Sequence, residues 1–384
     1  MQKIFFITLS RSDYTTTKPV ILKALDDKDI DVNVIVGGSH LLPQFGSSVD
    51  VIKSDGIPIY KTVDFFYEKD NTESDIAYAY SRCISLFVDI FTNDKPDRIF
   101  IIGDRWEMLA VASAASMLKI PIFHHSGGDI TQGSADNQIR YALTNLSHFH
   151  FVALEEHKQR LEKIGEEPWR VVVTGEPALT EIMLKNSELD VSLGINVKEP
   201  FVLATFHPTS FDKLNYDEQV KFFTDVLKDL PFNILLTAPN PDPGNKVFYD
   251  ALKSFSAEYK KVIFCENLGT KKYYYAMSKA AFMVGNSSSG IWEAPSFQLP
   301  VVNIGNRQQD RRCGDNVIHV GYSKSEVQNA IKKIQNDDFK KIVESCDNPY
   351  VQKDTLEKII THLKADFDKH TLLSKKFIDP LRKD

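Results

Sequence analysis

Cysteine is scarce in this chain: Cys83, Cys265, Cys313 and Cys346 are its four cysteines, scattered over 384 residues. They form no CxxC pair and no cluster with the spacing of metal ligands. The sequence therefore predicts neither a disulfide framework nor a metal site. Widely separated thiols are typical of proteins kept in a reducing compartment, so we expect a cytoplasmic location.

Long apolar runs are also lacking. No stretch approaches the roughly 18 apolar residues that a membrane-spanning helix needs, so we expect no membrane partner. The stretch Ile4-Phe5-Phe6-Ile7 is too short for a signal peptide and is better explained as a first strand. The net charge of -6 lacks the basic excess of nucleic-acid-binding proteins, so we expect no nucleic-acid partner.

Several familiar motifs are missing as well. No GxGxxG follows the strand expected at 3–9, and no GxxxxGK[ST] occurs, which excludes the usual dinucleotide and P-loop sites. No GxSxG is present, which excludes the nucleophile elbow of the α/β-hydrolases.

What the chain does contain is an alternation of apolar strands with amphipathic helices. A length of 384 residues exceeds one ordinary core and predicts two domains. Strands that alternate with helices indicate βαβ units and parallel sheets. The polar stretch 186–199 is the expected linker between two α/β halves.

The apolar pattern also predicts the bounds of several elements. We expect a strand at 3–9, a loop at 10–17 and then a helix that has Pro19 in its first turn and runs to Leu25. We expect a polar loop at 61–75, a helix at 291–297 and tail helices at 352–368.

The stretch Val284-Gly285-Asn286-Ser287-Ser288-Ser289-Gly290-Ile291-Trp292-Glu293 is the most informative part of the sequence. It follows an apolar run and leads into an expected helix. Two glycines allow the backbone to bend, and three hydroxyls lie between them, an arrangement that suits a phosphate. Glu293 lies about one turn into the expected helix and could accept the hydroxyls of a ribose. An ordinary capped βα turn is the alternative.

Polar clusters follow the expected strands repeatedly. Taken singly, each has a structural explanation; Asp104, for example, could cap the next helix. Together they lie at the carboxyl ends of parallel strands, where open α/β sheets bind their ligands. The clusters are Ser10-Arg11-Ser12-Asp13, Gly103-Asp104-Arg105, Ser126-Gly127-Gly128-Asp129, His207-Pro208-Thr209, Pro239-Asn240-Pro241-Asp242 and Gly285-Asn286-Ser287.

The set of motifs, in this order, resembles the UDP-N-acetylglucosamine 2-epimerase family, specifically its hydrolysing branch. The resemblance runs from Ser10 to about Pro349. The most specific segments are Gly103-Asp104-Arg105-Trp106-Glu107, Gly127-Gly128-Asp129-Ile130-Thr131, Asp136 with Ile139-Arg140, Ser147-His148-Phe149-His150-Phe151, Phe206-His207-Pro208, Gly285-Asn286-Ser287-Ser288-Ser289-Gly290 and Gly305-Asn306-Arg307-Gln308.

The resemblance implies two Rossmann-like domains in the glycosyltransferase-B arrangement, with the ligand in the cleft between them. We expect a sugar-side, catalytic domain at 1–186, a nucleotide-side domain at 187–365, and a C-terminal helix within 366–384 that packs back on the first domain. The resemblance also implies a homodimer or homotetramer, and a reaction that needs no metal and no redox cofactor.

The implied reaction converts UDP-N-acetylglucosamine, or a UDP- or GDP-linked diacetamido-trideoxy sugar, into the nucleotide and a 2-epimerised free sugar. Elimination across carbons 1 and 2 gives a 2-acetamidoglucal, to which water adds with inversion at carbon 2. The products of such enzymes enter sialic or legionaminic acid synthesis.

The resemblance assigns roles to twelve residues of this sequence. The catalytic candidates are Asp104, Asp129 and Asp136, because a carboxylate in a closed cleft can have a pKa near neutrality. The substrate-binding candidates are Arg11, Arg105, His207, Asn240, Ser287, Ser288, Gly290, Glu293 and Arg307.

The sugar half departs from the family pattern in several places. Asp129 stands where members commonly have glutamate, and a shift of about 1 Å can be costly at a reacting centre. Asn137 replaces the second carboxylate of an acidic pair, and Tyr141 replaces a histidine. Leu9-Ser10-Arg11 stands in place of Gly-Thr-Arg. These changes point to an unusual sugar.

Three other functions fit the same fold. A non-hydrolysing 2-epimerase would release an epimerised sugar nucleotide, and a glycosyltransferase would transfer the sugar to an acceptor. A binding protein without turnover would be stabilised by UDP and would leave the sugar nucleotide intact.

Overall fold

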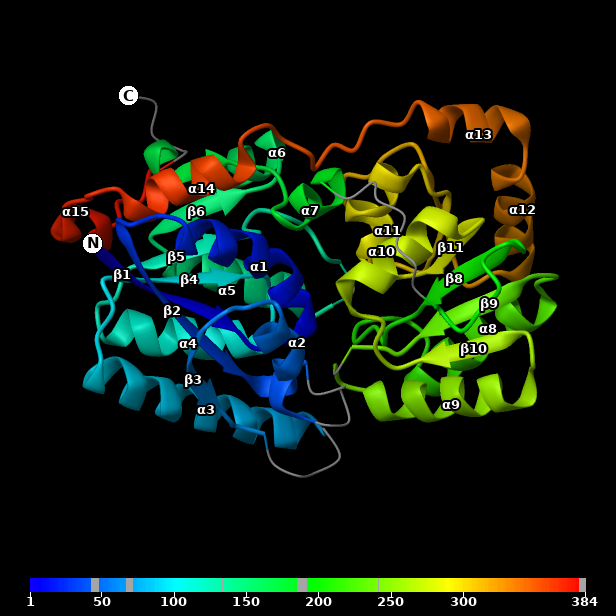
Figure 1. Cartoon of the computed structure of the whole chain (residues 1–384), viewed down its shortest axis with the longest axis horizontal. Coiled ribbons are helices and arrows are strands. Elements are labelled where there is room, and N and C mark those ends of the chain that lie inside the picture. Colours follow the sequence, from blue (N-terminus) through cyan, green and yellow to red (C-terminus); the bar gives the residue numbers. More distant parts are fainter. Residues whose placement is uncertain (43–47, 67–71, 133, 185–191, 241, 380–384) are drawn as a thin grey trace.

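The protein folds into two lobes, each built on a parallel sheet (Figure 1). The computed structural model describes residues 1–42, 48–66, 72–132, 134–184, 192–240 and 242–379. The first part of the expected linker, 186–191, and the expected boundary at 186/187 lie outside the described residues.

The first sheet has seven strands in the order β3-β2-β1-β4-β5-β6-β7. These are β1 (Gln2–Thr8), β2 (Ile30–Gly37), β3 (Ile59–Val63), β4 (Arg98–Ile102), β5 (Ile122–His125), β6 (Phe149–Val152) and β7 (Val171–Val173). The α-helices of this lobe are α1 (Arg11–Leu25), α2 (Val49–Ser54), α3 (Glu73–Asn93), α4 (Trp106–Met117), α5 (Asp136–Leu146), α6 (Glu155–Lys163) and α7 (Ala178–Leu184).

The second sheet has six strands in the order β10-β9-β8-β11-β12-β13. These are β8 (Phe201–Thr205), β9 (Asn233–Thr237), β10 (Val262–Cys265), β11 (Phe282–Gly285), β12 (Val301–Ile304) and β13 (Val317–Val320). The α-helices are α8 (Tyr216–Asp229), α9 (Asn245–Glu258), α10 (Gly269–Lys279), α11 (Ser289–Trp292), α12 (Lys324–Ile334) and α13 (Asp337–Glu344).

Both faces of the first sheet are buried, as its apolar strands require. Alternate residues of β1 point to opposite faces. Phe5 and Ile7 join one core with α3 and α4, whereas Ile4 and Phe6 join another core that includes α1. The strands therefore read as continuous apolar runs, which is why the sequence revealed them.

The strand order places the functional clusters. In each sheet the order reverses beside the first strand, between β1 and β4 and between β8 and β11. Ligands of open α/β sheets bind at this switch point. The segments that follow these four strands carry Arg11, Asp104, His207 and Asn286, so both switch points face a polar cleft.

The chain returns to the first lobe near its C-terminus (Figure 1). Helix α14 (Thr355–Lys364) and the short α15 (Lys369–Leu373) lie on that side. Ile359, Ile360 and Leu363 are buried in the same core as Ile4 and Phe6. We therefore propose that the second domain ends before α14, earlier than the boundary at 365 expected from the sequence.

The start of α1 differs from the expectation. The helix begins at Arg11, so 10–17 is not a loop and Pro19 lies inside the helix. Ser10 caps it, since its side chain accepts from the backbone N–H of Asp13. The capping serine outweighs the missing N–H of the internal proline.

Three other expectations about elements were wrong. The supposed loop at 61–75 contains the end of edge strand β3, and β13 and α13 were not anticipated. Both are short edge strands that contain polar residues, Lys61 and Thr62 in β3 and His319 in β13, so their apolar signal is weak. The helix expected at 291–297 is the four-residue α11 followed by a 3-10 turn at Ala294–Phe297, because Pro295 lacks the N–H that would continue an α-helix.

Candidate functional site: a cleft between the two sheets

Side chains from both lobes meet across the cleft. Arg105 donates to Asp242 Oδ1 at 2.7 Å, and Arg11 donates to the carbonyl of Glu266 at 3.0 Å. The amide of Gln132 also donates to a second-lobe carboxylate, at 2.7 Å. The two lobes are therefore in contact at the site that the sequence indicated.

Arg140 gathers the first-lobe acidic segments. It is fully buried on α5 and donates to the carbonyl of Asp129 at 3.0 Å and to Thr131 Oγ1 at 2.6 Å. The same guanidinium also pairs with the carboxylate of Asp104. The structure thus brings Asp104 and the 129–131 loop together, although they are far apart in the sequence.

Asp136 is the carboxyl best suited to exchanging a proton. Burial and the neighbouring charges of Asp104 and Asp242 raise its pKa to about 6, while Arg307 opposes this effect. Its carboxylate lies 4.0 Å from the Arg307 guanidinium of the other lobe. A carboxyl with a pKa this close to neutrality can both take and return a proton at physiological pH.

Asp129 is in a different electrostatic environment. Burial alone would raise its pKa, but Arg311, Arg140 and His157 together hold it well below the usual range. Its carboxylate pairs with Arg311 of the second lobe and accepts from the backbone N–H of Ile130 at 2.7 Å. In this arrangement Asp129 is a fixed negative charge that joins the lobes, rather than a proton carrier.

His207 is held as a neutral imidazole. Its Nδ1 accepts from the backbone N–H of Asn240 at 3.0 Å, so the proton lies on Nε2. Burial, assisted by Arg307, lowers its pKa to about 3. Asn286 fixes the segment, because its side chain accepts from the His207 N–H at 2.7 Å and donates to the His207 carbonyl at 2.8 Å.

The serine turn presents a row of hydroxyls. Ser289 Oγ lies 3.0 Å from Ser287 Oγ and 2.6 Å from the Tyr273 hydroxyl. Ser287 and Ser288 are half-buried, so they are open to a ligand. A Cβ on Gly290 would lie only 2.9 Å from Val301 Cγ1, so glycine is required there. Because α11 has four residues, its dipole adds little and the hydroxyls carry the polar character.

A line of polar contacts links this turn to the cleft. Arg307 and Gln308 both donate to the carbonyl of Asn286, at 3.3 and 2.9 Å. Arg311 donates to Gln308 Oε1 at 2.7 Å and lies 4.6 Å from the ring centre of Trp292. These side chains order the second-lobe side of the cleft.

Arg105 is a bridge between the lobes in this structure. Its second terminal nitrogen donates to Glu107 Oε1 at 3.0 Å, opposite the contact with Asp242. Glu107 is buried, and desolvation raises its pKa to about 7 although Arg105 opposes this. With both terminal nitrogens occupied, Arg105 is better placed to fix the cleft than to bind a phosphate.

Sequence reasoning assigned no role to several residues that the structure places here. Most of these residues lie within or next to the motifs quoted above, so the motifs could have indicated them. The motifs do not reveal which residue each side chain contacts. They are Asp13, Glu107, Glu176, Asp242, Asn286, Gln308 and Arg311.

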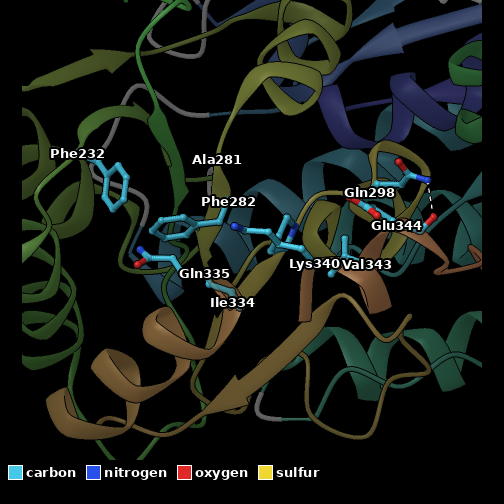
Figure 2. Close-up of a pocket in the computed structure, with 10 residues that line it drawn as sticks. Phe232, Ala281, Phe282, Gln298, Ile334, Gln335, Lys340, Val343 and Glu344 are labelled. Atoms are coloured by element: carbon cyan, nitrogen blue, oxygen red, sulfur yellow. Dashed lines mark hydrogen bonds between the residues drawn. The ribbon is translucent and has the colours of Figure 1, made fainter. Parts of the chain in front are cut away.

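A pocket of about 290 Å³ lies elsewhere in the second lobe (Figure 2). Phe232, Phe282 and Pro300 line it at the amino-terminal ends of β9, β11 and β12, together with Lys340 and Val343 of α13. The ligand sites of parallel sheets lie at the opposite edge. We therefore assign no part of the cleft chemistry to this pocket.

The fold and the cleft define a class of protein. Two parallel sheets whose switch points both face one polar cleft are the glycosyltransferase-B arrangement, confirming the expected fold. The chain belongs to the UDP-N-acetylglucosamine 2-epimerase family, whose sequence profile matches residues 23–364.

Three relatives specify the family further. The chain is 32% identical to the GDP/UDP-N,N'-diacetylbacillosamine 2-epimerase (hydrolyzing) of Campylobacter jejuni, over 98% of this chain and 99% of that protein. It is 32% identical to the UDP-N,N'-diacetylbacillosamine 2-epimerase (hydrolyzing) of Legionella pneumophila, over 88% and 89%. It is 30% identical to the polysialic acid biosynthesis protein P7 of Escherichia coli, over 93% and 92%.

Solved structures support the same fold. The crystal structure of UDP-GlcNAc 2-epimerase from Neisseria meningitidis bound to UDP-GlcNAc matches with a TM-score of 0.80 and 19% identity, over 94% of this chain and 99% of that chain. The resemblance to the hydrolysing branch is thus confirmed, and the chain is an enzyme of the hydrolysing sugar-nucleotide 2-epimerase type.

Among the described residues, no helix has the length and apolar character needed to cross a membrane.

Proposed function

We propose that this enzyme hydrolyses a nucleotide-linked 2-acetamido sugar and releases the nucleotide and the 2-epimerised free sugar. The observation that carries the proposal is the contact between Asp136 and Arg307. It sets a carboxyl with a pKa of about 6 on the sugar side 4.0 Å from an arginine on the nucleotide side. A base and a charge that stabilises the leaving group are what the elimination step needs.

In the proposed first step, Asp136 removes the proton from carbon 2. The electron pair forms the carbon 1–carbon 2 double bond as the bond from carbon 1 to the phosphate oxygen breaks. Arg307, the Nε2–H of His207 and the hydroxyls of Ser287 and Ser288 stabilise the charge on the departing diphosphate. Arg11 adds a second guanidinium at the edge of the cleft.

In the second step, water adds its hydroxyl to carbon 1 and the proton that this water loses is delivered to carbon 2, while Asp136 releases the proton from the first step to solvent. Inversion requires that this proton reach the face opposite to the one first deprotonated. The charge of Asp104 raises the pKa of Asp136, which is consistent with two neighbouring carboxyls in the cleft. We assign Asp104 this second role, and Asp129 the role of holding the cleft closed.

The altered sugar half supports a diacetamido-trideoxy substrate. Asn137 uses its side-chain oxygen to accept from the backbone N–H of Thr131 at 3.0 Å, so it shapes the sugar-side loop instead of adding a charge. The relatives from Campylobacter jejuni and Legionella pneumophila are named for diacetylbacillosamine. We propose a UDP- or GDP-linked sugar of that class, with UDP-N-acetylglucosamine as the other candidate.

The biological setting follows from the same proposal. The freed sugar would supply sialic or legionaminic acid synthesis, in the cytoplasm where nucleotide sugars are made. We also propose a homodimer or homotetramer, as the family resemblance implies.

Product analysis tests the function. Purified enzyme is incubated with each of the three sugar nucleotides, and the products are separated by chromatography. We expect free nucleotide and free sugar in equal amounts from one of the diacetamido-trideoxy substrates. An epimerised sugar nucleotide would indicate the non-hydrolysing reaction. A glycoside formed only when an acceptor is added would indicate a transferase.

A further inference from the structure

Three buried polar groups lack hydrogen-bond partners at the boundary of the two lobes. Within the described part of the chain, no partner is found for Glu176 Oε1, Glu293 Oε2 or the Tyr274 hydroxyl. Burying a polar atom without a partner costs about 1–3 kcal/mol, so such atoms call for an explanation. Leu179 and Ile291, close in sequence to Glu176 and Glu293, belong to one buried apolar cluster, so the two segments pack together. Unpartnered polar groups on segments that lie side by side suggest a ligand.

Glu176 is fixed in place by the first lobe. It follows β7 in the segment Gly175-Glu176-Pro177, is 2% exposed, and its N–H donates to the carbonyl of Tyr350 at 2.9 Å. The Thr16 hydroxyl and the Ala178 N–H bond to its carboxyl group. Oε1 has no partner among the described residues, so it can form a hydrogen bond with a ligand.

Glu293 and Tyr274 come from the second lobe. Glu293 follows the serine turn, and its charge acts on Glu176 and on both Tyr273 and Tyr274. Tyr273 is bonded to Ser289 at 2.6 Å, so this group of residues adjoins the row of serine hydroxyls. The row of serine hydroxyls, which suits a phosphate, is therefore followed in the cleft by the carboxyls of Glu293 and Glu176.

The chemistry of the group favours hydroxyls as ligands. Burial raises the pKa of Glu176 to about 8, and burial likewise raises that of Glu293 to about 7. Near neutral pH such carboxyls can accept one hydrogen bond and donate another, which suits an alcohol. An anion would be repelled by whichever carboxyl is ionised, and no cationic side chain of the described chain completes an ion pair with Glu176.

We propose that Glu176 is a specificity-determining residue that binds a ribose hydroxyl of the nucleotide together with Glu293 and Tyr274. This inference rests on the proposed function, because it takes the ligand to be a ribonucleotide. It adds a first-lobe residue to a subsite otherwise built from the second lobe. Recognition of the ribose therefore depends on the lobes being closed.

Calorimetric titration tests the proposal with UDP and GDP and with their 2′-deoxy and 3′-deoxy forms. We expect the wild-type enzyme to bind its preferred ribonucleotide about tenfold more tightly than the weaker deoxy form, the worth of one lost hydrogen bond to a charged or buried partner. Glu176→Met removes the hydrogen bond at similar volume. It should reduce that preference to less than about threefold and leave affinity for the deoxy nucleotide unchanged.

The controls separate two kinds of failure. Glu199→Gln removes an exposed carboxylate of the 192–200 segment and should retain the full preference. If Glu176→Met does not fold, Glu176→Ala makes the same comparison with water in the vacated space. If neither UDP nor GDP binds the wild-type enzyme, the proposed function fails. If the ribonucleotide binds but the preference is absent, or survives in both variants, only the role of Glu176 is overturned.

Discussion

Arg311 of the second lobe pairs with the carboxylate of Asp129 in the first, and the two side chains are almost fully buried. The other terminal nitrogen of Arg311 donates to Gln308 at 2.7 Å, and Gln308 donates to the Asn286 carbonyl at 2.9 Å. Asn286 in turn fixes His207. An acidic loop of the first lobe is thus connected, through one arginine, to the histidine of the second lobe.

Breaking this pair should destabilise the closed enzyme. Arg311→Met leaves Asp129 buried with fewer partners, and removal of one member of a buried pair typically costs about 3–5 kcal/mol. We expect a lower free energy of unfolding in urea and a larger radius of gyration by small-angle scattering. Arg312→Met changes the exposed neighbouring arginine and is the matched control. Equal stability of the two variants would refute a closing role for Arg311.

The pH dependence of turnover should report Asp136. Its pKa of about 6 lies above the ordinary carboxyl value, so activity should rise with pH as the base form appears, with a midpoint near 6. Arg307 lowers this pKa, so Arg307→Gln should move the midpoint to higher pH. The measurement is kcat/KM from about pH 4.5 to about pH 8.5. A midpoint that does not move would show that another group controls the acidic limb.

Asn286 should matter for stability and for the orientation of His207. Asn286→Ala removes two hydrogen bonds and leaves the buried N–H and carbonyl of His207 unpaired, at an expected cost of about 2–4 kcal/mol. Turnover should fall with it. Asn196→Ala changes an exposed residue whose side chain bonds to Glu199 at 3.0 Å and to the Lys198 N–H at 3.1 Å; it is the control and should be nearly neutral. The readout is urea unfolding at constant pH.

Acid should weaken the fold through buried histidines. Burial lowers the pKa of His124 to about 3 and that of His125 to about 4. The unfolded chain binds these protons near pH ~6.5, so the folded state loses stability as the pH falls from there toward 4, by up to about 1.4 kcal/mol per unit and residue. His125→Gln should lessen the slope of unfolding free energy against pH. The exposed His370→Gln should leave it unchanged.

Much of the fold could be predicted because buried parallel strands are continuous apolar runs. Strands such as Ile99-Phe100-Ile101 have no polar face to confuse the pattern. Edge strands β3 and β13 are short, mostly not fully buried and interrupted by polar residues, so the apolar pattern does not reveal them. The predicted start of α1 was wrong because Pro19 is typical of a first helical turn, whereas Ser10 caps the helix well before it.

The location of the site could be predicted, but its electrostatics could not. The family resemblance identified Asp104, Asp129 and Asp136 as candidates. Which of them exchanges a proton depends on distant partners: Arg311 keeps Asp129 ionised, whereas Asp104 and Asp242 raise the pKa of Asp136. Those partners come from the other lobe or from the segment after another strand. The spacing of residues in the sequence does not reveal how close they lie in the folded protein.

The central claim is that the enzyme makes and rehydrates a glucal. The most direct test follows each of the three sugar nucleotides by proton NMR in deuterated water, with wild-type enzyme and with Asp136→Asn. The account predicts release of nucleotide with a manno-configured free sugar that carries deuterium at carbon 2, and loss of both by the variant. A free sugar that retains its original proton at carbon 2, or no turnover of any substrate while UDP still binds, would contradict it.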